Sequence, residues 1–383
     1  MKLAFICTEL LPCPAIRGGA IQTLIDGVTP ILGQKHDLTI FCVRDPNLPN
    51  REKRDGIQYI RLPSKNYARE VAKELAKHDF DVIHVFNRPV NVPMYKAAAS
   101  KSRIVLSLHN EMFAKGKISY RLGLKAIRSV EKIMTVSDYI GKTVTGRFSS
   151  AQNKIQTVYS GADLSAYVPV WSSKGQEIRA KIRKKMGLKG KKVILFVGRL
   201  SRVKGPHLLI KAMNDIKTKH KKAVLVIIGG RWFSDNRVDR YVRYLHKLAK
   251  PLKDRVIFTK YVPADKLPAY YLAGHVFVCS SQWQEPLARV HYEAMAAGIP
   301  LITTKRGGNA EIVNHKFNGL VVEDYNNPKA FAKAIDFLLS NRDRAGVFAR
   351  NGRSFVESNF QFKHVAERLE KVYLEALGVE ESE

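Results

Sequence analysis

The sequence predicts an α/β protein built from two doubly wound domains. At 383 residues the chain is longer than one ordinary hydrophobic core requires, so two domains are expected. Short, continuous apolar runs, typical of buried parallel strands, alternate with helical patterns along most of the chain. A basic stretch at 164–190 interrupts this alternation, which then restarts. The change in composition marks a domain boundary there.

The first series opens with a strand pattern at 2–8, followed by a loop and then by Gly18-Gly19 at the start of a helix that reaches about Leu32. Free backbone N–H groups at a helix start attract anions, so this arrangement is a candidate phosphate cradle. The glycine pair fits neither the dinucleotide GxGxxG pattern nor a P-loop. A tight turn without a ligand is the commoner explanation of two adjacent glycines.

The same patterns place the remaining elements. In the first half, strands are expected near 38–43, 57–61, 81–86, 103–108 and 132–136, and helices near 67–77, 91–99 and 117–130. In the second half, strands are expected near 192–197, 223–228, 255–259, 276–279 and 300–304, and helices near 328–340, 342–357 and 362–377. Ligands of such sheets collect beyond the carboxyl ends of the strands, which directs attention to the loops found there.

The most informative loop lies in the stretch EPLARVHYEAMAAGIPLITTKRGGNAE, from Glu285 to Glu311. Pro286 predicts the start of a helix, which places Glu285 at its N-terminus and Glu293 two turns into it. Gly307-Gly308 then predicts a turn into a further helix. A partly desolvated carboxylate needs hydrogen-bond donors, and a sugar diol supplies two. On spacing alone, two solvated glutamates on one helix remain an equal alternative.

This stretch resembles the signature of the retaining nucleotide-sugar glycosyltransferases of family 4, which have the two-domain GT-B fold. The matching residues are Glu285, Glu293, Ala294-Met295-Ala296, Gly298-Ile299-Pro300, Gly307-Gly308 and Glu311. The likeness covers nearly the full length and is greatest to the bacterial spore-coat glycosyltransferases. Leu287-Ala288 departs from the family, which usually has Phe-Gly or a similar pair at this place. A β-carbon at this place is expected to narrow the approach to the donor sugar.

The resemblance implies a domain plan. It consists of an N-terminal acceptor-side domain at 1–168 and a nucleotide-sugar-binding domain at 169–360. A segment at 361–383 supplies a helix that returns to the first domain and an acidic tail. Both domains are expected to be Rossmann-like and to face each other across a cleft.

The resemblance also implies roles for individual residues. Arg199 and Lys204 follow the first strand of the second domain, where two cations and a helix start would stabilise the leaving diphosphate without a metal. The further residues implied are Gly18 and Gly19 at the diphosphate, Val262 at the base, Glu293 at the ribose, Gly307 and Gly308 at the donor, and Glu285 and His109 at the reacting sugar. By position alone, His109 would be read as a structural histidine just past a strand.

The charge of the chain is unusual, with 65 Lys and Arg against 34 Asp and Glu, and it implies anionic partners. Zinc-finger spacing, RNP-like aromatics and basic-zipper heptads are missing from the sequence, so nucleic acid is not expected. Basic residues with helical spacing form one predicted stripe of Lys117, Arg121, Lys125, Arg128 and Lys132. This stripe suits an anionic acceptor, lipid-linked or polymeric, or a peripheral membrane contact. A solvated helix face is the alternative.

Asp79 and Asp81 spell a DxD, a motif of metal-dependent sugar transferases. It precedes its strand, whereas ligands collect beyond strand carboxyl ends, so no metal site is expected. No cofactor besides the nucleotide-sugar substrate is expected either. Four cysteines without metal-binding spacing suit a reducing cytosol, and the sequence predicts a cytoplasmic protein, peripheral at a membrane or spore coat.

The function expected is metal-independent transfer of a sugar from a nucleotide-diphospho-sugar, with uridine as the preferred carrier, and with retention of configuration. Two alternatives remain. One is a spore-coat or scaffold protein that keeps the fold without the chemistry, and the other is a GT-B nucleotide-sugar isomerase.

Overall fold

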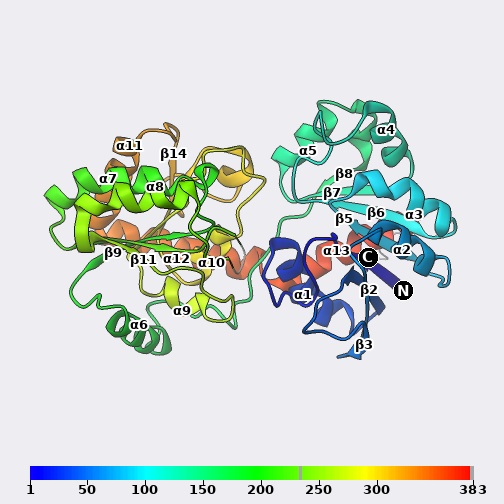
Figure 1. Cartoon of the computed structure of the whole chain (residues 1–383), viewed down its shortest axis with the longest axis horizontal. Helices are drawn as coiled ribbons and strands as arrows, with labels where there is room; N and C mark the ends of the chain where they lie inside the picture. Colours follow the sequence, from blue (N-terminus) through cyan, green and yellow to red (C-terminus); the bar gives the residue numbers. More distant parts are fainter. Residues whose placement is uncertain (233–234, 380–383) are drawn as a thin grey trace. The chain divides into compact units, whose positions relative to one another are not determined.

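The computed structural model describes residues 1–232 and 235–379 and divides the chain into two compact units (Figure 1). The first unit comprises residues 1–161 together with the C-terminal segment from Phe362. The second unit comprises residues 162–361. Each is an α/β unit with its own sheet, and each is described by itself.

The sheet of the first unit has the strand order β3-β4-β2-β1-β5-β6-β7-β8. Its strands are β1 (Lys2–Ile6), β2 (Asp37–Val43), β3 (Arg51–Arg54), β4 (Ile57–Leu62), β5 (Val82–Phe86), β6 (Arg103–Leu108), β7 (Lys132–Thr135) and β8 (Ile155–Thr157). β3 pairs antiparallel with β4, whereas the other pairs within this order are parallel. The central strand β1 lies between β2 and β5, with Leu3 opposite both Leu38 and Val82.

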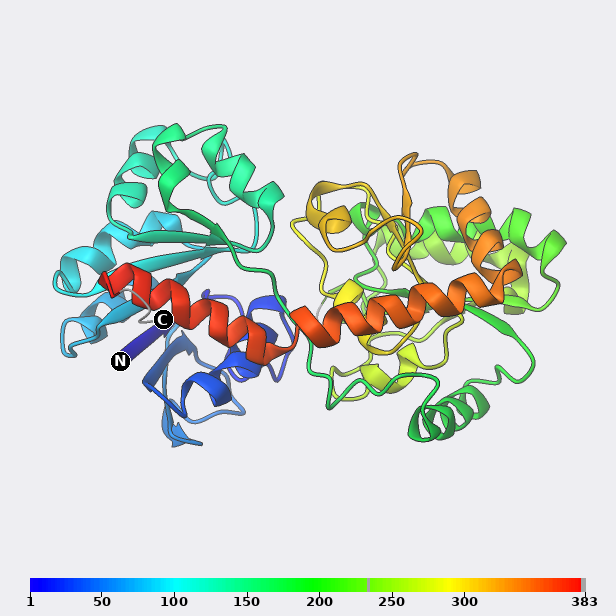
Figure 2. The same cartoon turned by 180° about the vertical axis from the view of Figure 1, so that it is seen from behind.

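Helices cover the first sheet. They are α1 (Ala20–Leu32), α2 (Tyr67–Leu75), η1 (Pro89–Asn91), α3 (Val92–Ala98), α4 (Tyr120–Arg128), α5 (Asp138–Thr145), η2 (Ser149–Lys154) and α13 (Phe362–Leu377). The last of these comes from the far end of the chain and packs against α1, as expected (Figure 2). A β-carbon at Gly27 of α1 would lie only 2.3 Å from the Phe362 ring, so glycine permits this close approach. The Tyr373 hydroxyl lies 2.8 Å from Nδ1 of buried His84.

The sheet of the second unit has the order β11-β10-β9-β12-β13-β14, and its pairs are parallel. Its strands are β9 (Lys192–Val197), β10 (Ala223–Ile228), β11 (Val256–Phe258), β12 (Val276–Val278), β13 (Leu301–Thr304) and β14 (Leu320–Val322). From β9 the chain adds β10 and β11 on one side, and it then returns to add β12, β13 and β14 on the other side, so the direction of the strand order switches between β9 and β12. Such a switch point is where open α/β sheets bind ligands.

Helices of the second unit flank this sheet. They are α6 (Ser173–Lys185), η3 (Arg202–Lys204), α7 (Pro206–Lys219), α8 (Arg240–Ala249), η4 (Lys250–Arg255), α9 (Leu267–Tyr271), α10 (Val290–Ala296), η5 (Gly307–Glu311), α11 (Pro328–Ser340) and α12 (Arg342–Asn359). Apolar residues of α7, α8 and α11 form one continuous core with the strands. This core holds the loops at the carboxyl edge of the sheet in place.

The predicted strands and long helices agree with the structure, with some misses. The short strands β3, β8 and β14 and the helices α8 and α9 were not predicted. β3 reads REKR and is mostly exposed, so it carries no buried-strand pattern.

The predicted basic stripe is shorter than expected. α4 spans Tyr120–Arg128, so Lys117 precedes the helix and Lys132 begins β7. Lys132 instead forms an ion pair with Glu375 of α13 at 2.5 Å. The stripe that remains exposed on α4 consists of Arg121, Lys125 and Arg128.

Candidate active site

The site of the second unit centres on the Glu285 carboxylate, in the loop that follows β12. Its Oε2 atom lies 2.6 Å from Nζ of Lys204, in the turn after β9, and accepts hydrogen bonds of 2.7 Å from Ser281 Oγ and Trp283 Nε1. Only 6% of Glu285 is exposed. Three donors therefore converge on one buried oxygen from two strands that are neighbours in the sheet.

These contacts decide the charge of Glu285. Burial alone would raise the pKa of this carboxyl, but the charge and hydrogen bond of Lys204, with the hydrogen bonds from Ser281 and Trp283, outweigh it. The pKa of Glu285 is consequently below its usual value, and the side chain is a carboxylate at neutral pH. A buried carboxylate with a lysine partner suits chemistry in which positive charge develops on a substrate.

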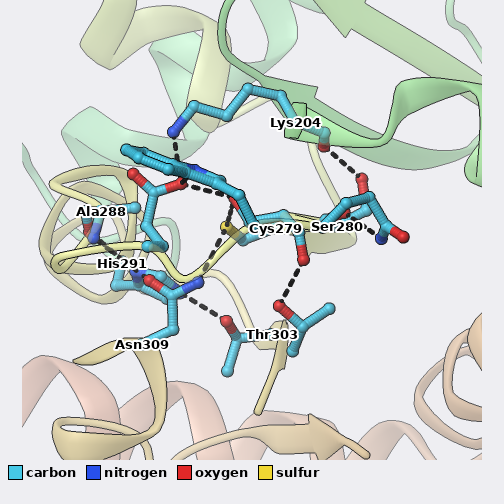
Figure 3. Close-up of polar contacts among 12 residues, drawn as sticks. Lys204, Cys279, Ser280, Ala288, His291, Thr303 and Asn309 are labelled. Atoms are coloured by element: carbon cyan, nitrogen blue, oxygen red, sulfur yellow. Dashed lines mark hydrogen bonds and ion pairs between the residues drawn. The ribbon is translucent and has the colours of Figure 1, made fainter. Parts of the chain in front are cut away.

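The turn that carries Lys204 depends on a glycine. Gly205 has φ of 72°, and a β-carbon there would lie 2.1 Å from the Ser280 carbonyl oxygen. Ser280 Oγ in turn donates to the Lys204 carbonyl oxygen at 3.0 Å (Figure 3). This close packing of the β9 and β12 loops sets the distance between Lys204 and Glu285.

Contrary to the prediction from Pro286, no helix begins at this proline, and α10 begins only at Val290. The Glu285 carbonyl accepts from the Gly308 N–H at 2.8 Å, and the Ala288 N–H donates to Asn309 Oδ1 at 3.2 Å. Bonds to η5 thus replace the bonds that a helix would make here. Glu285 lies in a loop ahead of the helix.

The glycine pair Gly307-Gly308 supports this loop. Gly307 has φ of 54°, and a β-carbon there would lie 2.1 Å from the Glu285 carbonyl oxygen. Its N–H donates to Gln284 Oε1 at 2.7 Å. In this structure both glycines contact the loop that carries Glu285.

Glu293 is in the first turn of α10 rather than two turns into a helix. Its Oε2 atom accepts a hydrogen bond of 2.8 Å from the Tyr271 hydroxyl, and its Oε1 atom lies 3.9 Å from Nε of Arg289. The side chain is 13% exposed. It is therefore a second, partly covered carboxylate, held by α9 and by the Glu285 loop.

A buried polar cluster lies beneath the loop (Figure 3). Nδ1 of fully buried His291 donates to the Ala288 carbonyl at 2.7 Å, and Nε2 lies 2.7 Å from Thr303 Oγ1. Burial alone would lower the pKa of His291, but the neighbouring Cys279 thiol and the Ala288 carbonyl raise it above its ordinary value. Through the hydrogen bond from His291 to its carbonyl, this cluster fixes the position of Ala288.

Arg199 and Val262 follow β9 and β11. The Arg199 guanidinium carbon lies 4.3 Å from the centroid of the Trp232 ring, and burial lowers the pKa of this arginine. Val262 is buried in the loop after β11. Neither residue shares a hydrogen bond with Glu285. The negative charge of Glu285 acts to raise the pKa of Arg199, but burial outweighs this effect.

The candidate residues of the first unit lie at the carboxyl edge of its own sheet. Gly19 caps α1 with φ of 111°, and Gly18 precedes it with φ of 77°. His109 follows β6; its N–H donates to Asn87 Oδ1 at 2.9 Å, and its ring stacks on Phe86 at 6.0 Å between centroids.

A hollow of about 520 Å³ also lies in the first unit, lined mainly by polar residues that include Glu9 and Arg88. Arg88 binds Glu9 through Nε at 2.8 Å and Nη2 at 2.6 Å. Burial opposes ionisation of Glu9, but Arg88 outweighs it and lowers the pKa of that carboxyl.

The DxD aspartates lie elsewhere. Asp81 directly precedes β5 and accepts the Lys2 N–H at 2.7 Å, so it serves the amino end of the sheet. Within residues 1–232 and 235–379, no group of three or more His, Cys, Asp or Glu side chains is arranged to hold a metal ion.

Ser281, Trp283, Tyr271 and Asn309 were missed by the sequence reasoning, although they hold the two carboxylates and their loop. A signal existed for the first two, which stand between the end of β12 and Glu285. Polar side chains in a loop after a strand are candidates on position alone. Tyr271 and Asn309 carried no such signal.

Two doubly wound units, each with polar side chains gathered where its strands end, are the architecture of the GT-B glycosyltransferases. Two family models match the chain: Glycosyltransferase Family 4 over residues 23–166, and Glycosyl transferases group 1 over residues 178–355. The chain belongs to glycosyltransferase family 4, a family of retaining enzymes that transfer sugar from nucleotide sugars.

Relatives support this assignment along the whole chain. YtcC of Bacillus subtilis, described as a glycosyltransferase, is 55% identical over 377 residues, covering 98% of this chain and 93% of YtcC. Spore coat protein SA of the same organism is 50% identical over 373 residues, covering 97% and 99%.

Solved structures share the fold. Anabaena Alr3699/HepE in complex with UDP and glucose matches with a TM-score of 0.80 at 18% identity, covering 97% of this chain and 98% of that one. The sucrose-phosphate synthase of Thermosynechococcus elongatus matches with a TM-score of 0.78 at 21% identity, covering 98% of each chain. Among the helices of the described residues, none combines the length and apolar composition needed to cross a bilayer.

Proposed function

We propose that the chain transfers a hexosyl group from a UDP-sugar to an acceptor with retention of configuration and without a metal ion. The observation that carries this proposal is the ion pair of Lys204 with buried Glu285 at 2.6 Å. It brings a cation for the leaving group and a carboxylate for the reacting sugar into one place.

Lys204 and Arg199 are the proposed diphosphate ligands. Negative charge grows on the leaving diphosphate as the glycosidic bond breaks, and fixed cations stabilise it. In this structure Lys204 is bound to Glu285, whereas Arg199 stacks on Trp232. Donor binding would supply Lys204 with a second anion. The amides at Gly18-Gly19, at the start of α1, are proposed to meet the same diphosphate.

Glu285 is proposed to act at the sugar. Its lowered pKa keeps it ionised, so it can orient the sugar hydroxyls or stabilise the oxocarbenium-like transition state. Glu293 is proposed to accept hydrogen bonds from the ribose hydroxyls, since Tyr271 and Arg289 already fix its direction. His109 is proposed to contact the sugar, Val262 the base, and Gly307-Gly308 to position the Glu285 loop for the donor.

The uridine carrier is supported by the Anabaena protein, whose structures include complexes with UDP and with UDP-glucose. A mycobacterial relative at 25% identity is named as GDP-mannose-dependent, so guanosine is the competing carrier. Thermal shift with UDP, GDP, UDP-glucose and GDP-mannose in EDTA separates the two. Ligand at about 100 times its Kd adds about 2.7 kcal/mol to the free energy of unfolding. Stabilisation by GDP-mannose alone would overturn the uridine assignment, and transfer that required added Mg²⁺ or Mn²⁺ would overturn metal independence.

For the acceptor we propose an anionic, polymeric or lipid-linked molecule recruited by Arg121, Lys125 and Arg128 of α4, which are exposed. Each basic residue near an anionic surface contributes about 1 kcal/mol. Charge reversal at these three positions should abolish co-sedimentation with anionic liposomes or with a phosphate-rich glycopolymer. Reversal of Lys181, Lys184 and Lys185 on α6, which are also exposed, changes the same number of charges and is the matched control. Equal binding by both variants would mean that the basic residues of α4 are an ordinary solvated surface and do not recruit the acceptor.

A non-catalytic coat protein is the second candidate. It is favoured by Leu287-Ala288 in place of the usual family pair and by a relative named spore coat protein SA. Incubation with UDP-glucose and a panel of acceptors tests it. Nucleotide binding without UDP release would support the coat protein, while turnover of the nucleotide sugar without any acceptor would indicate an isomerase.

A further inference from the structure

The second unit also has a hollow, of about 860 Å³, which opens between the loops after β9 and β10 and the start of α8. Its size is within the range of about 300–1,000 Å³ usual for small-molecule sites. Its lining includes neither Lys204, Glu285 nor Glu293. Its lining does include Arg199, which is also one of the proposed donor residues. We call it the arginine pocket, after the five arginines in its lining, Arg199, Arg202, Arg231, Arg237 and Arg240.

The charge of the arginine pocket is only partly balanced. Arg231 pairs with Asp235 at 3.3 Å and with Asp239 at 3.1 Å, and Arg237 pairs with Asp235 at 2.9 Å. Within the described part of the chain, Arg199, Arg202 and Arg240 have no carboxylate at ion-pair distance. Of these three, Arg202 and Arg240 are not among the proposed donor ligands, so their guanidinium groups remain to attract a second anion, and guanidinium geometry suits phosphate oxygens.

Aromatic rings order two of the three guanidinium groups. Arg199 lies over Trp232, and the Arg202 guanidinium carbon lies 6.0 Å from the centroid of the Tyr241 ring. Tyr241 is fixed in turn by its hydroxyl, 2.8 Å from Nδ1 of His207. Such stacking holds the nitrogen donors in place without using them for hydrogen bonds.

Two further features indicate a ligand with a sugar ring. Trp232 and Tyr244 are 49% and 37% exposed, and both line the pocket. Exposed aromatic faces pack well against the C–H faces of pyranose rings. Ser201 Oγ, also in the lining, is buried and has no hydrogen-bond partner among the described residues. It is a donor and acceptor that a ligand hydroxyl or phosphate would satisfy.

We propose that the arginine pocket is a second binding site, separate from the donor nucleotide site, for a phosphate-bearing sugar. Arg202 and Arg240 bind the phosphate, and the rings of Trp232 and Tyr244 bind the sugar. The phosphate comes either from a free sugar phosphate or from a phosphodiester within a glycan. A compact hollow of this volume favours a single sugar phosphate unit over an extended nucleic acid strand, which requires a groove along its backbone.

Isothermal titration of the full chain tests this proposal, first without UDP and then with UDP at saturation so that the donor site is occupied. The probes are glucose 6-phosphate, inorganic phosphate, glucose and a poly(glycerol phosphate) carrying glucose. We expect binding of glucose 6-phosphate, weaker binding of phosphate, and none of glucose. Preference for the polymer over the free sugar phosphate would identify a glycan as the source, and the reverse would identify a free sugar phosphate.

Two variants and a matched control locate the binding. Arg240→Gln should weaken glucose 6-phosphate binding by about tenfold, because a charge-assisted contact is lost. Tyr244→Ala should weaken glucose 6-phosphate but not inorganic phosphate. Arg243→Gln, which removes the same charge from an exposed position on the same helix outside the pocket, should bind as the parent does.

Four results would overturn the proposal. The first is the absence of binding by any phosphate probe. The second is equal weakening in Arg240→Gln and Arg243→Gln, which would mean general attraction to a basic surface. The third is complete loss of probe binding when UDP is added, which would make the pocket part of the donor site. Tighter binding of an oligonucleotide than of glucose 6-phosphate would likewise refute the ligand class.

Discussion

The carboxyl edges of the two sheets handle charge in different ways. In the second unit, loops from neighbouring strands converge on one buried carboxylate, and Glu285 takes its hydrogen bonds from Lys204 and two neutral donors. In the first unit, Arg88 and Glu9 form a closed pair beside a polar hollow. At this edge the second unit thus holds charges that an anionic donor can rearrange, as the proposed donor site requires. At the edge of its own sheet the first unit pairs Glu9 with Arg88, and the basic residues proposed to recruit an anionic acceptor lie on α4.

Glu285→Gln tests the second unit and should have the largest effect. The substitution keeps the shape and removes the charge that is proposed to stabilise the transition state. We expect kcat for sugar transfer to fall by about 10²–10³-fold. Glu323→Gln, at an exposed carboxylate of the same unit that pairs with Lys305, is the matched control. Transfer at the parent rate by Glu285→Gln would place the reacting centre elsewhere.

Lys204→Ala should have the next largest effect, this time on binding. Loss of a charge-assisted contact to the diphosphate should weaken UDP binding by about 1.5–3 kcal/mol. Lys305→Ala, the matched control, removes an exposed lysine of the same unit that pairs with Glu323, and it should leave UDP affinity as in the parent. Titration calorimetry with UDP measures both. Unchanged UDP affinity in Lys204→Ala would remove this lysine from the donor site.

His109→Ala extends the comparison to the first unit and should have a moderate effect. If the imidazole makes one hydrogen bond to the sugar, its loss costs about 0.5–1.5 kcal/mol in kcat/KM. The control is His78→Ala, at an exposed histidine of the same unit. Equal kinetics for His109→Ala and the parent would return His109 to a structural role beside Phe86 and Asn87.

The smallest effect expected is on the pH dependence of stability. Because the pKa of Glu285 is lowered in the folded state, the unfolded chain binds more protons as the pH falls, and this contribution to stability is lost on acidification. The difference in urea midpoint between parent and Glu285→Gln should therefore shrink between about pH 7 and pH 3. A difference that stayed constant over this range would mean that Glu285 is not ionised in the folded protein.

Local patterns determined much of this protein. The alternation of apolar runs and helical periodicity predicted the strands from β1 to β13, with β3 and β8 as exceptions, and the three long C-terminal helices. It did so because burial on both faces of a parallel strand leaves a continuous apolar run. The same reading placed Lys204 in the turn after a strand, whereas the return of α13 to the first unit was implied by the resemblance to family 4.

Contacts between distant segments were decided only by tertiary structure. Lys204 and Glu285 are 81 positions apart, and their pairing follows from β9 and β12 being neighbours in the sheet, which no local pattern encodes. The helix start predicted at Pro286 was wrong, because hydrogen bonds from Gly308 and to Asn309 hold this stretch as a loop and α10 begins only at Val290. The arginine pocket brings together the loops after β9 and β10 and the start of α8, a helix that was not predicted. Periodicity reports which face of an element is buried, whereas partners across a sheet depend on the strand order, and that order is set by the packing of the whole unit.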